Sequence, residues 1–499
     1  MINKKSYIIS IDQGSTSTKV LLIDKEGDIL SESNTKFKVF YPNQVFVEFD
    51  PVSLWESVEQ GLINVIKESK VDIENIKGLG VTNQRESIIM WNRNTGKPYL
   101  NGISWQCKRS VKLCDKLVEE GYGDFVREKT GLPIDSYYSA SKIAWVFKNY
   151  NLLSQNKNSE LNVGNVDSWI IWNLTKGKSF KTDVSNASRT LLMDVKTGKW
   201  DDDLLKLWDI PVNILPEIKM SSGLFGETSK DYFSSSIPIT GCIGDAQSAL
   251  FGQCAFEKYQ ASNTYGTASN LDINIGDKFF LSKNKIQTTV AWGIDGKLTY
   301  ALEGGVHTSG SVISWLKENL CLIQDEKEAD KIFLSTKNTD GVYFVPALVG
   351  TSMPNWDPFA RGLIIGLSFK TGKKEVVRAA LESIVFQVDD VTKAAEADLG
   401  SSLNDIRVTG GVSKSDAILQ FQSDISNVKI IRSSIIHSTA MGAAFLAGLG
   451  SGVWNGFGDL IKIFKIDRQF IPEMNEKERD VLKAMWKKAL KRSLSWVEE

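Results

Sequence analysis

Residues 7–24, YIISIDQGSTSTKVLLID, decide the fold class of this chain. Two runs of aliphatic and β-branched residues, 7–12 and 19–24, flank the polar stretch 13–18. Runs of this kind joined by Gly, Ser and Thr predict a β-hairpin. A third β-forming run, 28–39, follows a Glu-Gly turn, so the chain is expected to begin with three antiparallel strands.

A helix and a further strand are predicted to follow this hairpin. Asp50 and Pro51 suit a helix N-cap and a first helical position, and apolar residues then recur every fourth position from 54 to 66. A strand over 76–82 leads into the polar segment 83–86, NQRE. Strands and helices therefore alternate, which predicts an α/β protein.

A related order of elements recurs in the second half of the sequence. Strand-like runs at 259–265 and 271–275 flank a Gly-Thr turn, and a long helix is predicted over 375–399. The length of 499 residues allows two to four domains. We therefore predict two α/β domains of similar size, covering residues 1–254 and 255–499.

Composition excludes several classes of protein. Hydrophobic residues make up 42% and charged residues 24%, close to the average globular protein and unlike a mostly disordered chain. The formal net charge is −1, so a nucleic-acid partner held by bulk positive charge is not expected. Five scattered cysteines without a C-x-x-C motif predict reduced thiols and a cytoplasmic protein. Two histidines, His307 and His437, disfavour a histidine metal cage or a Ser-His-Asp triad.

No integral membrane segment and no secretory signal are expected. The N-terminal residues reach Asp12 without a long apolar core. The longest stretch without charges, 433–458, is interrupted by Gly and Ser and only weakly apolar. It predicts a buried, Gly- and Ala-rich helix packed closely against another element.

Three polar or glycine-rich turns each follow a predicted strand: 12–17 (DQGSTS), 265–267 (YGT) and 409–413 (TGGVS). Glycine lets the backbone come close to a phosphate, whose oxygens amides and hydroxyls then bind. Each turn alone is typical of an ordinary loop, and neither a Walker A motif nor G-x-G-x-x-G is present. Together they favour a nucleotide bound between the two halves.

Two acids, Asp12 and Asp245, end predicted strands. Alone, each is typical of a cap or turn residue. Beside phosphate-binding turns, the same pair suits phosphoryl transfer, in which one carboxylate holds Mg²⁺ and another accepts the proton of the attacking hydroxyl.

A polyol site is the second interpretation of four other residues. Arg85 and Glu86 form either a surface ion pair or a set of donors and acceptors for sugar hydroxyls. Trp105 and Tyr137 are either core aromatics or the walls of a pocket for a molecule with apolar C–H faces.

These segments together resemble the FGGY family of carbohydrate kinases over residues 7–496. Residues 137–145 (YYSASKIAW) look like the first family signature, and 362–367 (GLIIGL) with Glu375 and 379–382 (AALE) look like the second. The stretches GVTNQRES, SWQCKR, NASRTLL, NTYGT and YALEGGV are similar to the members that phosphorylate glycerol.

The resemblance implies two ribonuclease-H-like α/β lobes of the actin and hexokinase type, with ATP and substrate in a cleft between them. It implies transfer of the γ-phosphate of ATP, with Mg²⁺, to a primary hydroxyl. Glycerol, giving sn-glycerol 3-phosphate, is the expected acceptor, and a longer polyol or ketose, such as an erythritol- or pentulose-like molecule, is the alternative. A homodimer or homotetramer is also implied.

The resemblance also implies roles for individual residues. Asp245 would be the catalytic base, and Asp12 and Asp245 would hold Mg²⁺. The polyol would be bound by Arg85, Glu86, Trp105, Tyr137, Asp245 and Asn270. ATP would be bound by Ser15, Thr16, Ser17, Lys19, Gly266, Thr267, Gly310, Ser314, Gly411, Val412 and Ser415.

Several positions depart from the glycerol-specific pattern. Ala246 stands where Gln follows the catalytic Asp, Asn270 stands where Phe is usual, and Ala268 replaces a turn glycine. Lys19 stands where Arg is found, which keeps the charge and loses the bidentate fork. These changes predict a roomier, more polar acceptor pocket. An actin- or chaperone-like nucleotide-dependent binding protein is an alternative from another class, and Arg85, Glu86 and the two aromatic residues argue against it. An inactive relative is a third alternative, and the presence of both Asp12 and Asp245 argues against it.

Overall fold

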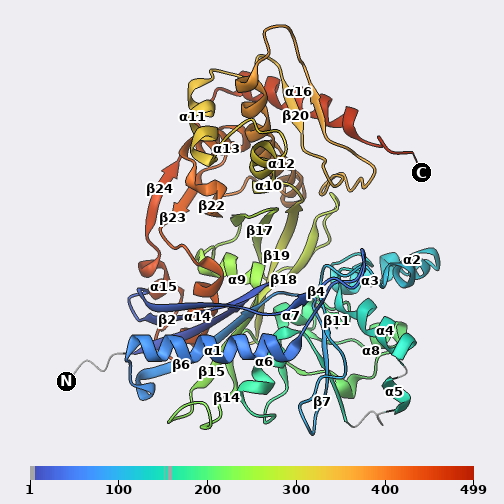
Figure 1. Ribbon diagram of the computed structural model, residues 1–499, viewed down its shortest axis with the longest axis vertical. Coiled ribbons are helices and arrows are strands. Elements are labelled where there is room, and N and C mark those ends of the chain that lie inside the picture. Colours follow the sequence, from blue (N-terminus) through green and yellow to red (C-terminus); the bar gives the residue numbers. More distant parts are fainter. Residues whose placement is uncertain (1–5, 151, 156–159, 499) are drawn as a thin grey trace.

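The predicted N-terminal hairpin lies within a six-stranded mixed sheet (Figure 1). The computed structural model describes residues 6–150, 152–155 and 160–498. In spatial order the sheet contains β14 (Ser222–Glu227), β15 (Pro238–Gly244), β6 (Ile76–Asn83), β1 (Tyr7–Gln13), β2 (Ser17–Asp24) and β3 (Ile29–Lys36). β1 runs parallel to β6 and antiparallel to β2, and β15 runs parallel to β6. The carboxyl ends of β1, β6 and β15 therefore meet at one end of the sheet.

A seven-stranded sheet in the second half repeats this topology. Its spatial order is β18 (Gln287–Ile294), β19 (Lys297–Val306), β17 (Ser269–Gly276), β16 (Gln260–Tyr265), β22 (Asp405–Gly410), β23 (Ile430–Ser433) and β24 (Ile466–Phe470). From β19 to β24, order and relative directions match those from β3 to β14, and β18 is an addition at the edge. The expected recurrence of two α/β lobes is thus confirmed. The boundary near residue 255, between β16 and the helix before it, stays a prediction.

α1 (Pro51–Ser69) begins and α12 (Lys373–Leu399) ends at the residues that the sequence indicates as caps. α1 starts after Asp50, whose carboxylate accepts a hydrogen bond from the amide of Val52 at 2.9 Å. The apolar face of α1 packs against β2 and β3. α12 ends at Gly400, whose φ of 62° lies in the left-handed region that favours glycine.

The Gly- and Ala-rich helix α14 (Ser438–Gly450) connects the two halves, since it packs against β1, β6 and β15 of the first sheet and against α9 (Asp245–Gly252) (Figure 1). Glycines allow this close approach. A Cβ at Gly80 would lie 2.2 Å from the carbonyl oxygen of Ala443, and one at Gly252 would lie 2.0 Å from that of Ser438. The predicted buried helix is confirmed, and no helix among the described residues is long and apolar enough to cross a membrane.

The other elements surround these two sheets. The helices are α2 (Val111–Glu119), α3 (Gly123–Thr130), α4 (Ser139–Tyr150), α5 (Leu152–Gln155), α6 (Val166–Leu174), α7 (Val184–Ser188), α8 (Asp202–Trp208), α10 (Gly310–Glu318), α11 (Glu326–Ser335), α13 (Asp416–Ser426), α15 (Phe457–Ile463) and α16 (Glu476–Ser493). The short strands are β4 (Val39–Phe40), β5 (Glu48–Phe49), β7 (Ile89–Asn92), β8 (Gly102–Ile103), β9 (Leu161–Gly164), β10 (Lys181–Asp183), β11 (Met193–Asp194), β12 (Lys199–Trp200), β13 (Glu217–Lys219), β20 (Tyr343–Val345) and β21 (Leu363–Ile365).

Candidate active site

Three strand ends of the first sheet bring predicted site residues together. Asp12 lies at the end of β1, Arg85 follows β6 and Asp245 follows β15. The guanidinium Nε of Arg85 lies 3.0 Å from Oδ1 of Asp245. That same oxygen also accepts a hydrogen bond from the amide of Ala246 at 2.8 Å. Oδ2 of Asp245 has no hydrogen-bond partner among the described residues, and the side chain is 40% exposed.

Asp12 and Asp245 have the chemistry of a magnesium site. Burial and the negative charge of Asp245 raise the pKa of Asp12, and Lys19 lowers it by less, so that this pKa is about 7. Carboxylate oxygens are the ligands that Mg²⁺ takes in proteins, usually one or two of them together with phosphate oxygens. A divalent cation between these two acids would also relieve their mutual repulsion, so the residues present fit this ion.

A buried network of four charges lies beside Asp245. Both oxygens of Glu303 accept hydrogen bonds from Arg85, at 2.6 and 3.0 Å. Arg189 binds Glu86 at 2.6 Å and Glu303 at 3.2 Å. All four side chains are at most 6% exposed, and their formal charges cancel. Burial raises the pKa of Glu303, but Arg189 and Arg85 outweigh it and lower that pKa to about 2.

Arg189 and Glu303 were not predicted from the sequence as site residues. Each is the one charged residue in an otherwise uncharged stretch, NASRTLL or YALEGGV. That isolation is a usable signal, because a charged side chain among apolar neighbours is rarely buried without a partner. The partners are far apart in sequence, however, and only the fold brings them together.

Aromatic side chains form a second wall of the candidate acceptor site. The rings of Trp105 and Tyr137 meet edge to face with centroids 5.5 Å apart. The indole Nε1 of Trp105 donates a hydrogen bond to Oγ of Ser15 at 3.0 Å, so this wall contacts the turn after β1. The guanidinium of Arg189 lies 5.9 Å from the centre of the Tyr137 ring. Both aromatic side chains are half-buried.

Asn270 lies on β17, on the same face as Asp272 two residues later. Asn270 Nδ2 donates a hydrogen bond to Oδ2 of Asp272 at 2.7 Å, while Oδ1 of Asp272 is buried with no hydrogen-bond partner in the part of the chain that the structure describes. Asp272 is the register partner of Glu303 on β19. Asn270, which stands where Phe is usual, thus lies on a polar face of the sheet. This face extends through Asp272 to Glu303 of the buried ion network.

Close backbone contacts at glycines shape the turns that are predicted to bind the nucleotide, which together form the nucleotide side of the candidate site. The turn after β16 exposes Gly266 and Thr267, and their carbonyl oxygens accept hydrogen bonds from the amides of Gly310 at 2.9 Å and Ser309 at 3.0 Å. A Cβ at Gly310 would lie 2.7 Å from the oxygen of Gly266. Gly411, after β22, donates its amide to Tyr265 at 3.0 Å. The predicted residues Gly266, Thr267, Gly310 and Gly411 therefore come together.

The remaining nucleotide-site predictions occupy different positions. Thr16 is exposed and Ser15 is half-buried in the turn after β1, and Ser17 is half-buried at the start of β2. Lys19 Nζ lies 2.9 Å from Nδ1 of His437. Val412 is buried close to the Gly310 backbone. Ser314 is exposed on α10, one turn after Gly310. Ser415 caps α13, accepting the amide of Ile418 at 3.2 Å and donating to Asp330.

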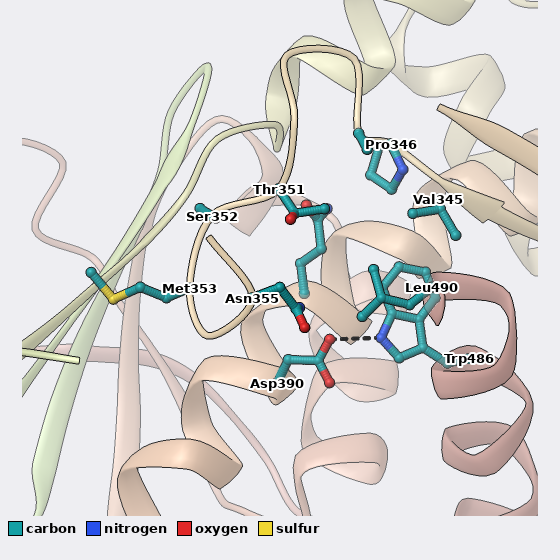
Figure 2. A pocket seen from close by; sticks show the side chains of 11 residues that line it. Val345, Pro346, Thr351, Ser352, Met353, Asn355, Asp390, Trp486 and Leu490 are labelled. Atoms are coloured by element: carbon teal, nitrogen blue, oxygen red, sulfur yellow. Dashed lines mark hydrogen bonds between the residues drawn. The ribbon is translucent and has the colours of Figure 1, made fainter. Parts of the chain in front are cut away.

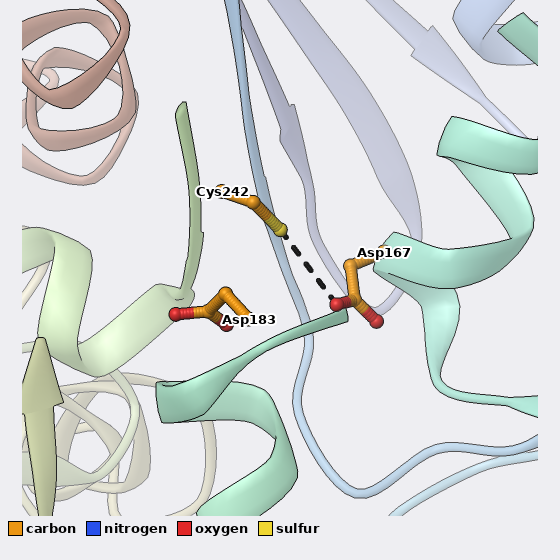
Figure 3. Close-up of side chains that lie close together, drawn as sticks. All are labelled: Asp167, Asp183 and Cys242. Carbon is orange, nitrogen blue, oxygen red and sulfur yellow. Dashed lines mark hydrogen bonds between the residues drawn. The ribbon is translucent and has the colours of Figure 1, made fainter. Parts of the chain in front are cut away.

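A separate acidic cluster lies beneath this end of the first sheet. Figure 3 shows Asp167, Asp183 and Cys242, whose ligand atoms all lie within 4.8 Å of one another. Both oxygens of Asp183 cap α7 by accepting backbone amides of residues 185 and 186. Burial raises the pKa of Asp167 to about 7, so this carboxyl is substantially protonated near neutral pH. These contacts explain the cluster as a buried group that caps the N-terminus of α7.

A small cavity in the second half holds none of the predicted site residues. It has a volume of about 20 Å³, room for about one water molecule, and is lined by loop residues 345–355 and by α12 and α16 (Figure 2). In it, Trp486 donates a hydrogen bond to Asp390 at 2.7 Å. The candidate active site therefore lies elsewhere, at the strand ends described above.

Known proteins match this chain over nearly its whole length. Residues 7–252 match the N-terminal domain and residues 261–451 the C-terminal domain of the FGGY family of carbohydrate kinases. A glycerol kinase of Caldanaerobacter subterraneus subsp. tengcongensis is 43% identical over 494 residues, 99% of each chain. Glycerol kinase 2 of Thermotoga maritima is 43% identical over 491 residues, 98% of this chain and 99% of its own. The crystal structure of Plasmodium falciparum glycerol kinase with ADP is similar at a TM-score of 0.94 and 37% identity, covering 99% of each chain.

Proposed function

Because the chain belongs to the FGGY family of carbohydrate kinases, we propose that it transfers the γ-phosphate of ATP to a primary hydroxyl of glycerol, giving sn-glycerol 3-phosphate. The observation that carries this proposal is Asp245. One oxygen of its carboxylate is held by Arg85 and a backbone amide, while the other is unpaired among the described residues on a side chain that is 40% exposed. This is the arrangement that a general base for an alcohol needs.

The proposed chemistry follows from these positions. Oδ2 of Asp245 accepts the proton of the acceptor hydroxyl, and the hydroxyl oxygen forms a bond to the γ-phosphorus. The bond from that phosphorus to the bridging oxygen of ATP breaks, and its electron pair leaves with ADP. Asp12 and Asp245 are the residues that would hold Mg²⁺, and the bound ion would supply positive charge against the phosphates. Lys19 and the backbone amides of the glycine turns bind the phosphates.

The polyol is proposed to bind between the ion network and the aromatic wall. Arg85 and Glu86 provide donors and acceptors already oriented by Glu303 and Arg189. Trp105 and Tyr137 cover the apolar C–H face of the acceptor. Binding then needs little side-chain ordering, which is the usual advantage of a preorganised site.

A longer polyol or a ketose is the second candidate acceptor, and Asn270 favours it. This side chain is half-buried on the polar face that leads to Asp272, and Ala246 beside the base is small. Both residues would leave space and a hydrogen-bonding group for an additional hydroxyl.

The experiment that tests the proposal is a Mg·ATP-dependent assay of ADP release by the purified protein. It is run without acceptor, with glycerol, and with four- and five-carbon polyols and ketoses. Strong stimulation by glycerol alone supports glycerol as the acceptor. A stronger response to a larger acceptor supports the second candidate, and no stimulation by any acceptor contradicts both.

Two further parts of the proposal concern the cellular location and the oligomeric state of the protein. We place the enzyme in the cytoplasm, because all five cysteines are free, as expected in a reducing compartment. A homodimer or homotetramer is proposed from the family resemblance, and light scattering on the purified protein measures it.

A further inference from the structure

A chain of three side chains links the candidate phosphate site to a surface cavity. Lys19 lies on β2 directly opposite Asp12 of β1. Its Nζ lies 2.9 Å from Nδ1 of His437, the residue that precedes α14. The other ring nitrogen, Nε2, lies 3.0 Å from a carboxylate oxygen of Glu32 on β3. Lys19, His437 and Glu32 thus form one continuous hydrogen-bonded chain across three elements.

We propose that His437, in its neutral form, is a positioning residue that holds the ammonium group of Lys19 in place for the phosphate being transferred. Glu32 fixes the imidazole in the tautomer that this task requires. The inference rests on the proposed function, because that function gives Lys19 its contact with phosphate.

The hydrogen-bonding capacities of the three groups determine the direction of the chain. An ammonium group has three donors and no acceptor, so Nδ1 of His437 must accept from Lys19. In a neutral imidazole the other nitrogen then carries the proton, and Nε2–H donates to the Glu32 carboxylate. The imidazole of His437 is 19% exposed, which limits its alternative contacts with water.

A lysine side chain needs such a positioning hydrogen bond more than an arginine side chain would. Its ammonium is a point charge on a flexible four-carbon stem, whereas the arginine fork is planar and preorganised. An untethered lysine loses more side-chain entropy when it engages a phosphate. A neutral acceptor at 2.9 Å restricts the stem beforehand and leaves the positive charge intact.

The charges around His437 keep it neutral near pH 7. Burial and the positive charge of Lys19 lower the pKa of His437, and Glu32 raises it by less. The cavity beside the imidazole, about 490 Å³ in volume, also contains Glu26, Asp28 and Lys465, of which the last two bind each other at 3.4 Å. When acid protonates His437, Nδ1 can no longer accept, and the imidazolium repels Lys19. The cavity gives solvent protons a route to this ring.

Histidine NMR tests the chain of contacts without any assay of activity. The protein has two histidines, so a His437→Gln variant assigns the ring signals of ¹⁵N-histidine-labelled protein. We expect an Nε2–H tautomer and a pKa below 6.5 that rises in Lys19→Met and falls in Glu32→Gln. An imidazolium at pH 7.5, or a His437 pKa unchanged in Lys19→Met, overturns the proposal whether or not the protein phosphorylates glycerol.

Kinetics against pH test the positioning itself. His437→Leu is expected to lower kcat at pH 7.5 about tenfold with the KM for glycerol unchanged. His437→Gln, whose amide oxygen still accepts from Lys19, is expected to stay within about threefold of the original and to lose the inflection at the His437 pKa. Lys465→Met, in the same cavity, is the control and keeps the original profile.

Two kinetic results overturn the inference. One is full kcat in His437→Leu, and the other is an unchanged inflection in His437→Gln. If no acceptor is phosphorylated at all, the NMR result still decides whether His437 holds Lys19, so failure of the proposed function is distinguishable from failure of this inference.

Discussion

The acceptor side and the nucleotide side of the candidate active site are built in different ways. On the acceptor side, Arg85, Glu86, Arg189 and Glu303 are buried and bind one another before any ligand arrives. On the nucleotide side, the turn 266–268 is exposed and its shape comes from backbone contacts between glycines. Folding therefore completes the acceptor side, whereas the shape of the nucleotide side depends on how closely backbones approach.

This contrast predicts different responses to substitution. Removing one member of a buried ion network leaves another charge unpaired, which is destabilising even without ligand. Exposed turns tolerate side-chain changes but not a change that separates packed backbones. On the acceptor side, a substitution should therefore lower the free energy of unfolding even without ligand. On the nucleotide side, only a substitution that separates packed backbones should lower it.

The largest expected effect is that of Asp245→Asn. The amide cannot accept the hydroxyl proton, so kcat is expected to fall about 10³-fold while the KM for the acceptor changes little. Steady-state assays of ADP release measure both constants. The mechanism would be wrong if the variant kept more than a tenth of the original kcat.

Glu303→Gln tests whether the acceptor side is formed by folding. The neutral amide leaves Arg85 and Arg189 buried without their shared carboxylate, and the free energy of unfolding should fall by about 3 kcal/mol. Urea denaturation without ligand measures it. Glu217→Gln, which breaks an exposed pair with Lys219 at 3.5 Å, is the matched control and should cost less than about 1 kcal/mol. Equal effects of the two variants would contradict the contrast.

Two neighbouring glycines test the nucleotide side. A Cβ at Gly410 would lie 2.2 Å from the carbonyl oxygen of Tyr265, and its φ of 98° is unfavourable for alanine. Gly410→Ala should therefore lower the free energy of unfolding by about 2 kcal/mol and weaken ATP binding. Gly411 has open space around its Cβ position and a φ of −62°, so Gly411→Ala should change stability by less than about 0.5 kcal/mol. Denaturation and calorimetric titration with ATP distinguish the two, and similar losses of stability would refute the backbone argument.

The acid cluster under the acceptor side predicts a pH effect on stability. The pKa of Asp167 is about 7 in the folded protein and 3.8 in its ordinary state, so the folded state binds the extra proton between these values. The free energy of unfolding therefore falls as pH rises through this range, by at most about 1.4 kcal/mol per pH unit. Asp167→Asn should flatten this slope and Asp480→Asn, on an exposed part of α16, should not. Parallel pH curves for the original protein and Asp167→Asn would contradict it.

Local signals in the sequence predicted the elements well. The hairpin over 7–24 and the start of α1 at Asp50 and Pro51 depend on neighbouring residues alone, and both are confirmed. Within the Gly- and Ala-rich stretch 433–458, the predicted closely packed helix is confirmed over Ser438–Gly450, because close approach requires small residues. The recurrence of elements predicted two α/β domains, and resemblance to a family supplied the type of lobe and the candidate roles.

The sequence alone did not predict which side chains of distant segments bind one another. Arg189 and Glu303 are 114 positions apart, and their charges meet because α7 packs against β18, the strand that pairs with β19. His437 was noted in the sequence as one of two histidines, without the partners that give it a task. Pairing of this kind depends on the register of two sheets, which no single segment encodes.

The smallest expected effect concerns the wall at Asn270. Asn270→Phe replaces a hydrogen-bonding side chain, which donates to Asp272 at 2.7 Å, with an apolar ring that fills the pocket. We expect kcat/KM for glycerol to rise about fivefold and that for a four-carbon polyol to fall by a similar factor, each about 1 kcal/mol. A competition assay with both acceptors measures the ratio directly. If both values fell together, the ring would be disturbing the buried face around Asp272 and Glu303 rather than selecting the acceptor, and the acceptor side would extend no further than the ion network. If the ratio changed as expected, Asn270 would be a position on this otherwise preformed side where specificity is adjustable.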